Sequence, residues 1–167
     1  MQRALDQRPD DPVIGFLTAV DTPTHGCLGG YLLVDGCGRP IEFHCTTPVK
    51  VSRAQQILYG ATLPGQLHGR HLGAALLGGA TVTPRLVVTD LETMLAVRTE
   101  TDLPVALVTA PDGDRPGTMV LGGAAVVPPP TRADDGWREA LEMLARAVDL
   151  HEPFGRIRAA IDEAQRH

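Results

Sequence analysis

The sequence has little of three residue types that are common on protein surfaces. Among its 167 residues one is lysine (Lys50), one is serine (Ser52) and none is asparagine. Its 15 lysines and arginines are outnumbered by 20 aspartates and glutamates, which gives a net charge of −5. Such a chain has no global positive field to attract nucleic acid or an anionic membrane. We therefore expect neither as a partner.

Long apolar runs are also absent. The longest, residues 72–80 and 119–127, are interrupted by glycine pairs and fall short of the roughly 20 residues that cross a bilayer. Residues 1–12 are charged and lack the apolar stretch of a signal peptide. The three cysteines are an odd number without a Cys-x-x-Cys motif, which favours reduced thiols inside a cell. These absences predict a cytoplasmic protein.

The order of elements predicts an α/β domain with a mixed sheet. We expect a flexible lead (1–12), an α/β domain (13–127), a proline-rich connector (128–131) and a helical hairpin (132–167) that packs on the domain or on a partner. Apolar or alternating stretches predict strands at 13–20, 28–34, 40–46, 85–89 and 104–109, and 118–127 as one more strand or a hairpin arm. Helices are expected at 52–59, 64–77 and 91–98.

Three local patterns make sharper predictions. The turn at 35–39, with two glycines, predicts a hairpin. Ser52 and Gln55 have the spacing of a capping box at the start of a helix. In strand 40–46, Ile41, Phe43 and Cys45 alternate with polar residues, so we expect these three in the core.

Three meandering strands followed by helix, strand, helix and strand resemble the ribonuclease H-like fold; a profilin-like or longin-like α+β fold is the alternative. The resemblance implies acidic metal ligands at Asp21, after the first strand, and at Asp90, after the fourth. Where that superfamily has a glutamate on the first helix, this chain has Gln55 and Gln56, and Asp112 is a candidate for a late ligand. Mg²⁺ or Mn²⁺ would be the cofactor of such a nuclease. The ordinary role of an aspartate at these positions is a helix or turn cap.

Four segments resemble an uncharacterised family of small bacterial proteins. They are GGYLLV (29–34), GRPIEFHCT (38–46), PVKVSRAQ (48–55) and ILYG (57–60). That family has no assigned activity, so this resemblance implies no function and no catalytic residue.

Other residues offer a binding site. Lys50 and Arg53 precede and begin a predicted helix close to His44, and backbone N–H groups with two cations suit a phosphate or carboxylate. His68 and His71 share a helix face, which we interpret as solvated. Zinc binding or thiol chemistry at the strand cysteines and histidines lacks a recognisable motif; these residues are His25, Cys27, Cys37, His44 and Cys45.

The residue patterns contain no complete catalytic set. The main hypothesis is therefore a non-catalytic accessory protein, without cofactor, that self-associates or docks a protein partner through its terminal helices. The alternative is a divalent-metal-dependent nuclease of the ribonuclease H-like type that uses Asp21, Asp90 and Gln56.

Overall fold

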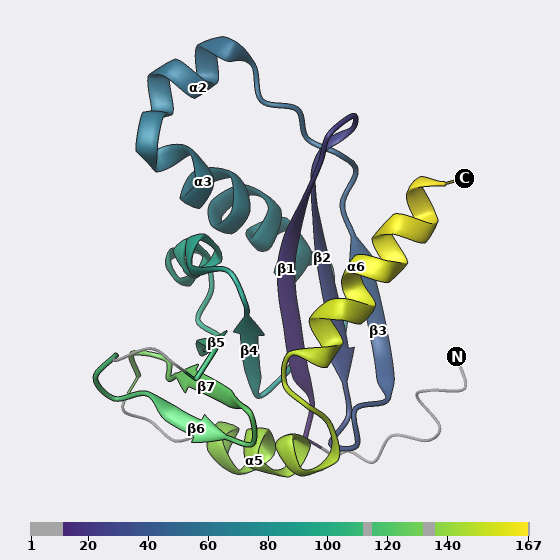
Figure 1. The fold of residues 1–167 in the computed structure, drawn as a ribbon, viewed down its shortest axis with the longest axis vertical. Coiled ribbons are helices and arrows are strands. Elements are labelled where there is room, and N and C mark those ends of the chain that lie inside the picture. The colour runs from purple at the N-terminus through teal and green to yellow at the C-terminus, as the bar shows by residue number, and fades with distance from the viewer. Residues whose placement is uncertain (1–11, 112–114, 132–135, 167) are drawn as a thin grey trace.

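The computed structural model describes residues 12–111, 115–131 and 136–166, and within them seven strands form one sheet (Figure 1). The strands are β1 (Ile14–Thr22), β2 (Gly26–Val34), β3 (Pro40–Cys45), β4 (Leu86–Thr89), β5 (Val105–Thr109), β6 (Met119–Leu121) and β7 (Ala124–Val127). The helical elements are α2 (Arg53–Tyr59), η1 (Gly60–Thr62), α3 (Leu63–Gly65), η2 (Gln66–Gly73), α4 (Ala74–Gly79), η3 (Glu92–Thr99), α5 (Trp137–Ala147) and α6 (Glu152–Gln165). None of the helices in these ranges is long and apolar enough to cross a membrane.

The strands lie in the order β3-β2-β1-β4-β5-β7-β6. β1, β2 and β3 are antiparallel neighbours, whereas β4 and β5 continue the sheet on the other side of β1 and run parallel to it. This is the ribonuclease H-like arrangement, so the predicted mixed α/β fold is confirmed. Residues 118–127 supply the β6–β7 hairpin at the far edge, where Gly122 has a φ of 62° in the turn.

Each face of the sheet carries its own hydrophobic core. α5 and α6 cover one face, where the rings of Phe16 and Phe154 meet edge to face with centroids 5.1 Å apart. η2, α4 and η3 cover the other face with Leu72, Leu76 and Met94. Figure 1 shows α6 lying across β1, β2 and β3. Because side chains alternate along a strand, even-numbered residues of β1 point toward α6 and odd-numbered ones toward η2.

The core positions predicted for β3 are correct at Ile41, which is 5% exposed, and wrong at Phe43 and Cys45. Phe43 is 39% exposed and Cys45 is exposed, whereas Glu42 is only 7% exposed. The Glu42 carboxylate accepts hydrogen bonds from the backbone N–H (3.0 Å) and the hydroxyl (2.6 Å) of Thr81, which ties β3 to the segment before β4. A hydrogen-bonded carboxylate is tolerated in an interior, so polarity alone misassigned the buried side of this strand. Cys45 is not a core residue.

The helices between β3 and β4 follow the predicted boundaries. α2 begins at the capping box: Ser52 Oγ accepts from the backbone N–H of Gln55 (3.1 Å), and the Gln55 amide oxygen accepts from the N–H of Ser52 (2.9 Å). The helix predicted at 64–77 is present as α3, η2 and α4, with η2 in π-helical geometry. Such wider turns recur at functional sites. No residue of α2 is buried, and α2 projects from the body (Figure 1).

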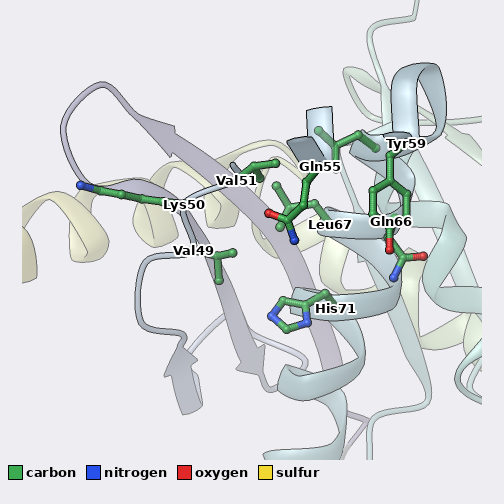
Figure 2. A pocket seen from close by; sticks show the side chains of 9 residues that line it. Val49, Lys50, Val51, Gln55, Tyr59, Gln66, Leu67 and His71 are labelled. Atoms are coloured by element: carbon green, nitrogen blue, oxygen red, sulfur yellow. The ribbon is translucent and has the colours of Figure 1, made fainter. Parts of the chain in front are cut away.

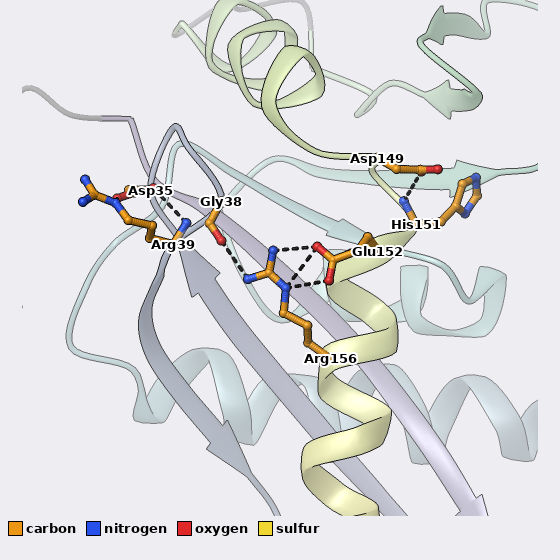
Figure 3. Close-up of polar contacts among 7 residues, drawn as sticks. All are labelled: Asp35, Gly38, Arg39, Asp149, His151, Glu152 and Arg156. Carbon is orange, nitrogen blue, oxygen red and sulfur yellow. Dashed lines mark hydrogen bonds and ion pairs between the residues drawn. The ribbon is translucent and has the colours of Figure 1, made fainter.

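Arg156 fastens α6 to the turn between β2 and β3 (Figure 3). Its guanidinium donates to the carbonyl oxygen of Gly38 (2.7 Å) and pairs with Glu152, one turn earlier on the same helix (2.6 Å). The turn itself is the predicted hairpin: the Asp35 carboxylate accepts from the backbone N–H of Arg39 (2.9 Å), and Gly38 has a φ of 83°. The C-terminal helices thus pack directly on the sheet.

Candidate metal centre and adjoining pockets

Asp90 is held on the α6 face of the sheet. β1 and β4 are parallel with Leu17 opposite Thr89, so the next residues, Thr18 and Asp90, are also neighbours. The buried Thr18 hydroxyl donates to Asp90 Oδ1 (2.6 Å), and Arg158 of α6 forms an ion pair with Oδ2. η3 begins without a side-chain cap, so Asp90 does not have the capping role considered for it. Its negative charge is neutralised by an arginine.

Asp21 lies on the opposite face. It stands directly across from Cys27 in the β1–β2 pair and has the odd-numbered orientation of Leu17 and Ala19 toward η2. Thr18, rather than Asp21, is the β1 neighbour of Asp90. Side chains alternate along a strand, so Asp21, three residues after Thr18, points to the opposite face of the sheet. The structure therefore does not bring the two candidate carboxylates together.

Asp21 instead meets a cysteine and a histidine. One ligand atom from each of Asp21, Cys27 and His68 lies within 4.8 Å of those of the other two. Asp21 ends β1, Cys27 begins β2, and His68 comes from η2. His68, which we expected on a solvated face, is half-buried, and its Nδ1 lies 2.7 Å from the Thr93 hydroxyl.

The backbone of β2 at Cys27 and the segment after β3 at Val49 lie close together beside the cluster. Cys27 and Val49 exchange two backbone hydrogen bonds of 2.8 Å, so the segment after β3 closes the edge of β2. Gly26 makes this possible: its φ is 103°, and a Cβ there would lie 2.5 Å from the carbonyl oxygen of Val49. The segment that carries Lys50 is thereby placed beside the cluster.

The electrostatics of the cluster leave both of its softer donors neutral. Burial, reinforced by a hydrogen bond and the charge of Asp21, raises the pKa of the Cys27 thiol to about 12. Burial lowers the pKa of His68, although the charge of Asp21 opposes this effect. Neutral His68 that donates from Nδ1 to Thr93 keeps a lone pair on Nε2. A cation would reverse the balance at Cys27, because a metal-bound thiol gives up its proton.

The donor set fits a borderline-soft ion. Sulfur, imidazole nitrogen and carboxylate oxygen are the three ligand types of Zn²⁺, which binds them at about 2.0–2.3 Å. Three protein ligands with a fourth position open is the arrangement of catalytic zinc sites, whereas Mg²⁺ prefers oxygen alone. The ligand atoms need to close in slightly around such an ion. The chemistry of the residues therefore fits zinc better than the Mg²⁺ or Mn²⁺ that the nuclease alternative implied.

Asp21 and Cys27 of the cluster line a hollow of about 420 Å³, whereas His68 is not among its lining residues. Asp21, Lys50 and Gln56, which the sequence suggested for separate roles, all line it together with Cys27. A second hollow, of about 210 Å³, shares Lys50 and three apolar residues with the first. In Figure 2 the side chain of Lys50 reaches away from this second hollow toward the β1–β2 hairpin.

The remaining candidate residues lie elsewhere. Arg53 is exposed on α2, where its guanidinium donates to the amide oxygen of Gln56 (3.3 Å). His44 pairs with Glu42 and lines neither hollow. Asp112 lies outside the described residues. Of the predicted anion-binding trio, Lys50 alone lines the hollow over the cluster.

The charge distribution around these hollows differs from that of the whole chain. All 20 acidic residues lie outside residues 43–89, whereas four of the 15 lysines and arginines and three of the six histidines lie inside. This stretch supplies α2, α3, η2 and α4, the whole lining of the smaller hollow, and five of the eleven residues that line the larger one. A count of charge along the chain, rather than its total, is the sequence signal that distinguishes this stretch from the acidic remainder.

Comparisons with known proteins give a fold without a family. No family model matches the chain, and no curated protein matches it. Human ENDOV is similar over 94% of this chain and 87% of its own, with 10% identity and a TM-score of 0.46. Endonuclease V of Ciona intestinalis, in complex with a 24mer DNA, is 8% identical over 64% of this chain, with a TM-score of 0.38. This chain spans about half the length of that protein (49%).

A further solved structure is Argonaute of Marinitoga piezophila in complex with a guide RNA. It is 10% identical and covers 81% of this chain and 25% of its own, with a TM-score of 0.40. These structures are of nucleases and of proteins bound to DNA or RNA, and this finding contradicts two predictions. One is the accessory protein that acts through protein–protein contacts without catalysis; the other is that nucleic acid is an unlikely partner. Because the likeness concerns the fold alone, function is argued below from this chain's own residues.

Proposed function

We propose that this protein is a metal-dependent nuclease whose metal ion is held by Asp21, Cys27 and His68. The observation that carries the proposal is the position of this mixed donor cluster beside a hollow where, among the described lining residues, Lys50 is present and Asp21 is the one acidic side chain. Hydrolysis of an anionic phosphodiester needs a cation to hold the phosphate and a Lewis acid; Lys50 is the cation, and an ion held by the cluster would be the Lewis acid. Asp90, paired with Arg158, takes no part in it.

The three ligands have distinct roles. Asp21 supplies the negative charge that draws a cation to the cluster, since His68 is neutral. Thr93 fixes the ring of His68, as residues behind a metal ligand commonly do. Cys27 releases its proton when the ion binds, so metal affinity rises with pH.

The reaction is hydrolysis of a phosphodiester bond. A bound zinc-type ion supplies Lewis acidity and lowers the pKa of a bound water. The oxygen of one water joins phosphorus, one phosphorus–oxygen bond breaks, and the departing oxygen takes up a proton, so that one water is consumed. Lys50 would hold the phosphate beside the cluster as a point charge.

The test combines metal analysis with a cleavage assay. Protein stripped by a chelator is reloaded with Zn²⁺, Mn²⁺ or Mg²⁺ and incubated with labelled single-stranded and duplex RNA and DNA. We expect one equivalent of bound zinc and metal-dependent cleavage. Cys27→Ser and His68→Gln should lose both, and Thr93→Val should weaken metal binding by about 10- to 100-fold.

Two control variants separate this cluster from the rest of the protein. Cys45→Ser changes an exposed cysteine and should bind zinc like the wild type. Asp90→Asn should retain cleavage within a few-fold, since its carboxylate serves the contact between β4 and α6. Circular dichroism verifies that each variant is folded. Cleavage that persists in folded Cys27→Ser and His68→Gln, or that disappears in folded Asp90→Asn, would overturn the proposal.

A further inference from the structure

A second pocket adjoins the proposed metal centre. Its volume is about 210 Å³, and it lies between the strand-like segment 49–51 and the helices α2, α3 and η2 (Figure 2). Val49, Lys50, Val51 and Leu67 line both this pocket and the hollow over the cluster, so the two are continuous along the protein surface. Pockets for drug-sized ligands measure roughly 300–1,000 Å³, so this one suits a single ring system.

The lining combines apolar walls with polar groups that converge on the opening. Val49, Val51, Leu63 and Leu67 supply the walls, and Tyr59 presents a ring that is 42% exposed. Figure 2 shows Tyr59, Gln55, Gln66 and His71 arranged around the cavity. None of the nine described residues that line it is acidic. An aromatic ring, aliphatic walls and amides together match a flat heteroaromatic group with hydrogen-bonding edges.

The capping box of α2 prepares one of these amides. The Gln55 side-chain oxygen accepts from the backbone N–H of Ser52 (2.9 Å), which fixes the orientation of the side chain. Its NH₂ group is then positioned to donate toward an acceptor in the pocket. A residue that secures the helix start therefore also presents a preorganised donor to a ligand.

We propose that this pocket binds one base of a nucleic acid strand whose neighbouring phosphate lies over the Asp21, Cys27 and His68 cluster; this inference rests on the proposed function. Lys50 connects the two positions, since it lines both hollows. The base stacks on Tyr59, and its edge receives hydrogen bonds from Gln55 and Gln66. Stacking on one aromatic side chain strengthens binding by about 5- to 150-fold.

Binding without cleavage tests this pocket separately from the metal centre. The full chain, freed of metal by a chelator, is titrated against a fluorescent single-stranded oligonucleotide and against the same backbone carrying abasic residues, as RNA and as DNA. Anisotropy reports the dissociation constants. We expect the oligonucleotide with bases to bind at least about 5-fold more tightly than the abasic one.

Variants of α2 and of Gln66, the first residue of η2, supply the comparisons. The affinity ratio is the affinity for the oligonucleotide with bases divided by that for the abasic one. Tyr59→Ala should bring this ratio close to one, Tyr59→Phe should retain it, and Gln66→Ala should lower it less. Leu58→Ala alters the neighbouring residue, which is 82% exposed and absent from the lining, and should leave the ratio unchanged. Because no residue of α2 is buried and Gln66 is not among the buried residues of η2, these substitutions spare the fold.

Equal affinities for the two oligonucleotides, or equal ratios in Tyr59→Ala and Leu58→Ala, would overturn the base pocket. If metal-dependent cleavage is present in that case, the proposed nuclease function stands without it. A ratio that depends on Tyr59 in a protein that cleaves nothing would instead support a base-binding site and refute the nuclease.

Discussion

The buried carboxylate of Glu42 allows the contribution of one side chain to stability to be calculated and tested. Burial by itself would raise its pKa, but hydrogen bonds from Thr81, His44 and Val82 outweigh burial and lower the pKa to about 2. An exposed glutamate titrates at about 4.3, roughly two pH units higher, and each unit corresponds to about 1.36 kcal/mol. The ionised carboxylate therefore contributes roughly 3 kcal/mol at neutral pH. Because the unfolded chain takes up the proton first, this contribution is complete above about pH 5 and is lost as the pH falls toward 2.

Glu42→Gln keeps the shape of the side chain but replaces one carboxylate oxygen, which accepts hydrogen bonds from Thr81 and Val82, with an NH₂ group that cannot accept them. We expect the free energy of unfolding to fall by about 3 kcal/mol at neutral pH, and the difference from the wild type to shrink to less than about 1 kcal/mol near pH 2. Urea unfolding, followed by the fluorescence of buried Trp137, measures the free energy of unfolding at each pH. Glu139→Gln, on an exposed residue of α5, should change stability by no more than about 0.5 kcal/mol. A Glu42→Gln deficit that is the same at neutral and acidic pH would refute the ionised carboxylate as its source.

Two further predictions concern the packing of α6 on the sheet. In Gly30→Ala the new methyl would lie 2.4 Å from Cγ2 of Ile157, so we expect a loss of roughly 1–3 kcal/mol in thermal unfolding. Gly123→Ala, with nothing within 4 Å, is the control, and equal melting temperatures for the two variants would contradict the close contact. Arg156→Ala removes the bond to the carbonyl of Gly38 at a cost of at most about 1 kcal/mol, because the guanidinium is partly exposed. Amide hydrogen exchange in the β2–β3 turn should become faster, and unchanged exchange would show that Arg156 does not hold the turn.

The total charge of the chain and the charge of the segment that lines the hollows differ in sign. A net charge of −5 describes a distant field, but charges in solution are screened over about 8 Å, so a ligand senses the nearest residues. Residues 43–89 contain no acidic residue and line both hollows. The acidic residues that produce the net charge lie on other segments, including the helices of the opposite face. Local charge and global charge therefore lead to opposite expectations for the same molecule.

Local patterns determined much of the secondary structure. The capping box at Ser52, the turn at residues 35–39 and the long helix after Pro64 depend on interactions between residues close in sequence, which is why each could be predicted. The order of the elements likewise predicted the ribonuclease H-like sheet. Polarity misled at β3, since Glu42 is buried by partners about 40 residues away.

The candidate site was decided by tertiary structure. Register between β1 and β4 placed Thr18 beside Asp90, and Arg158 of a helix 68 residues later neutralised that carboxylate. Asp21 met Cys27 through antiparallel pairing and His68 through the packing of η2, contacts that no spacing in the sequence encodes. The sequence by itself therefore determined which elements form and in what order, because those depend on neighbours along the chain. Which side chains share a face of the sheet depends on register and packing between distant segments, and only the folded chain sets these.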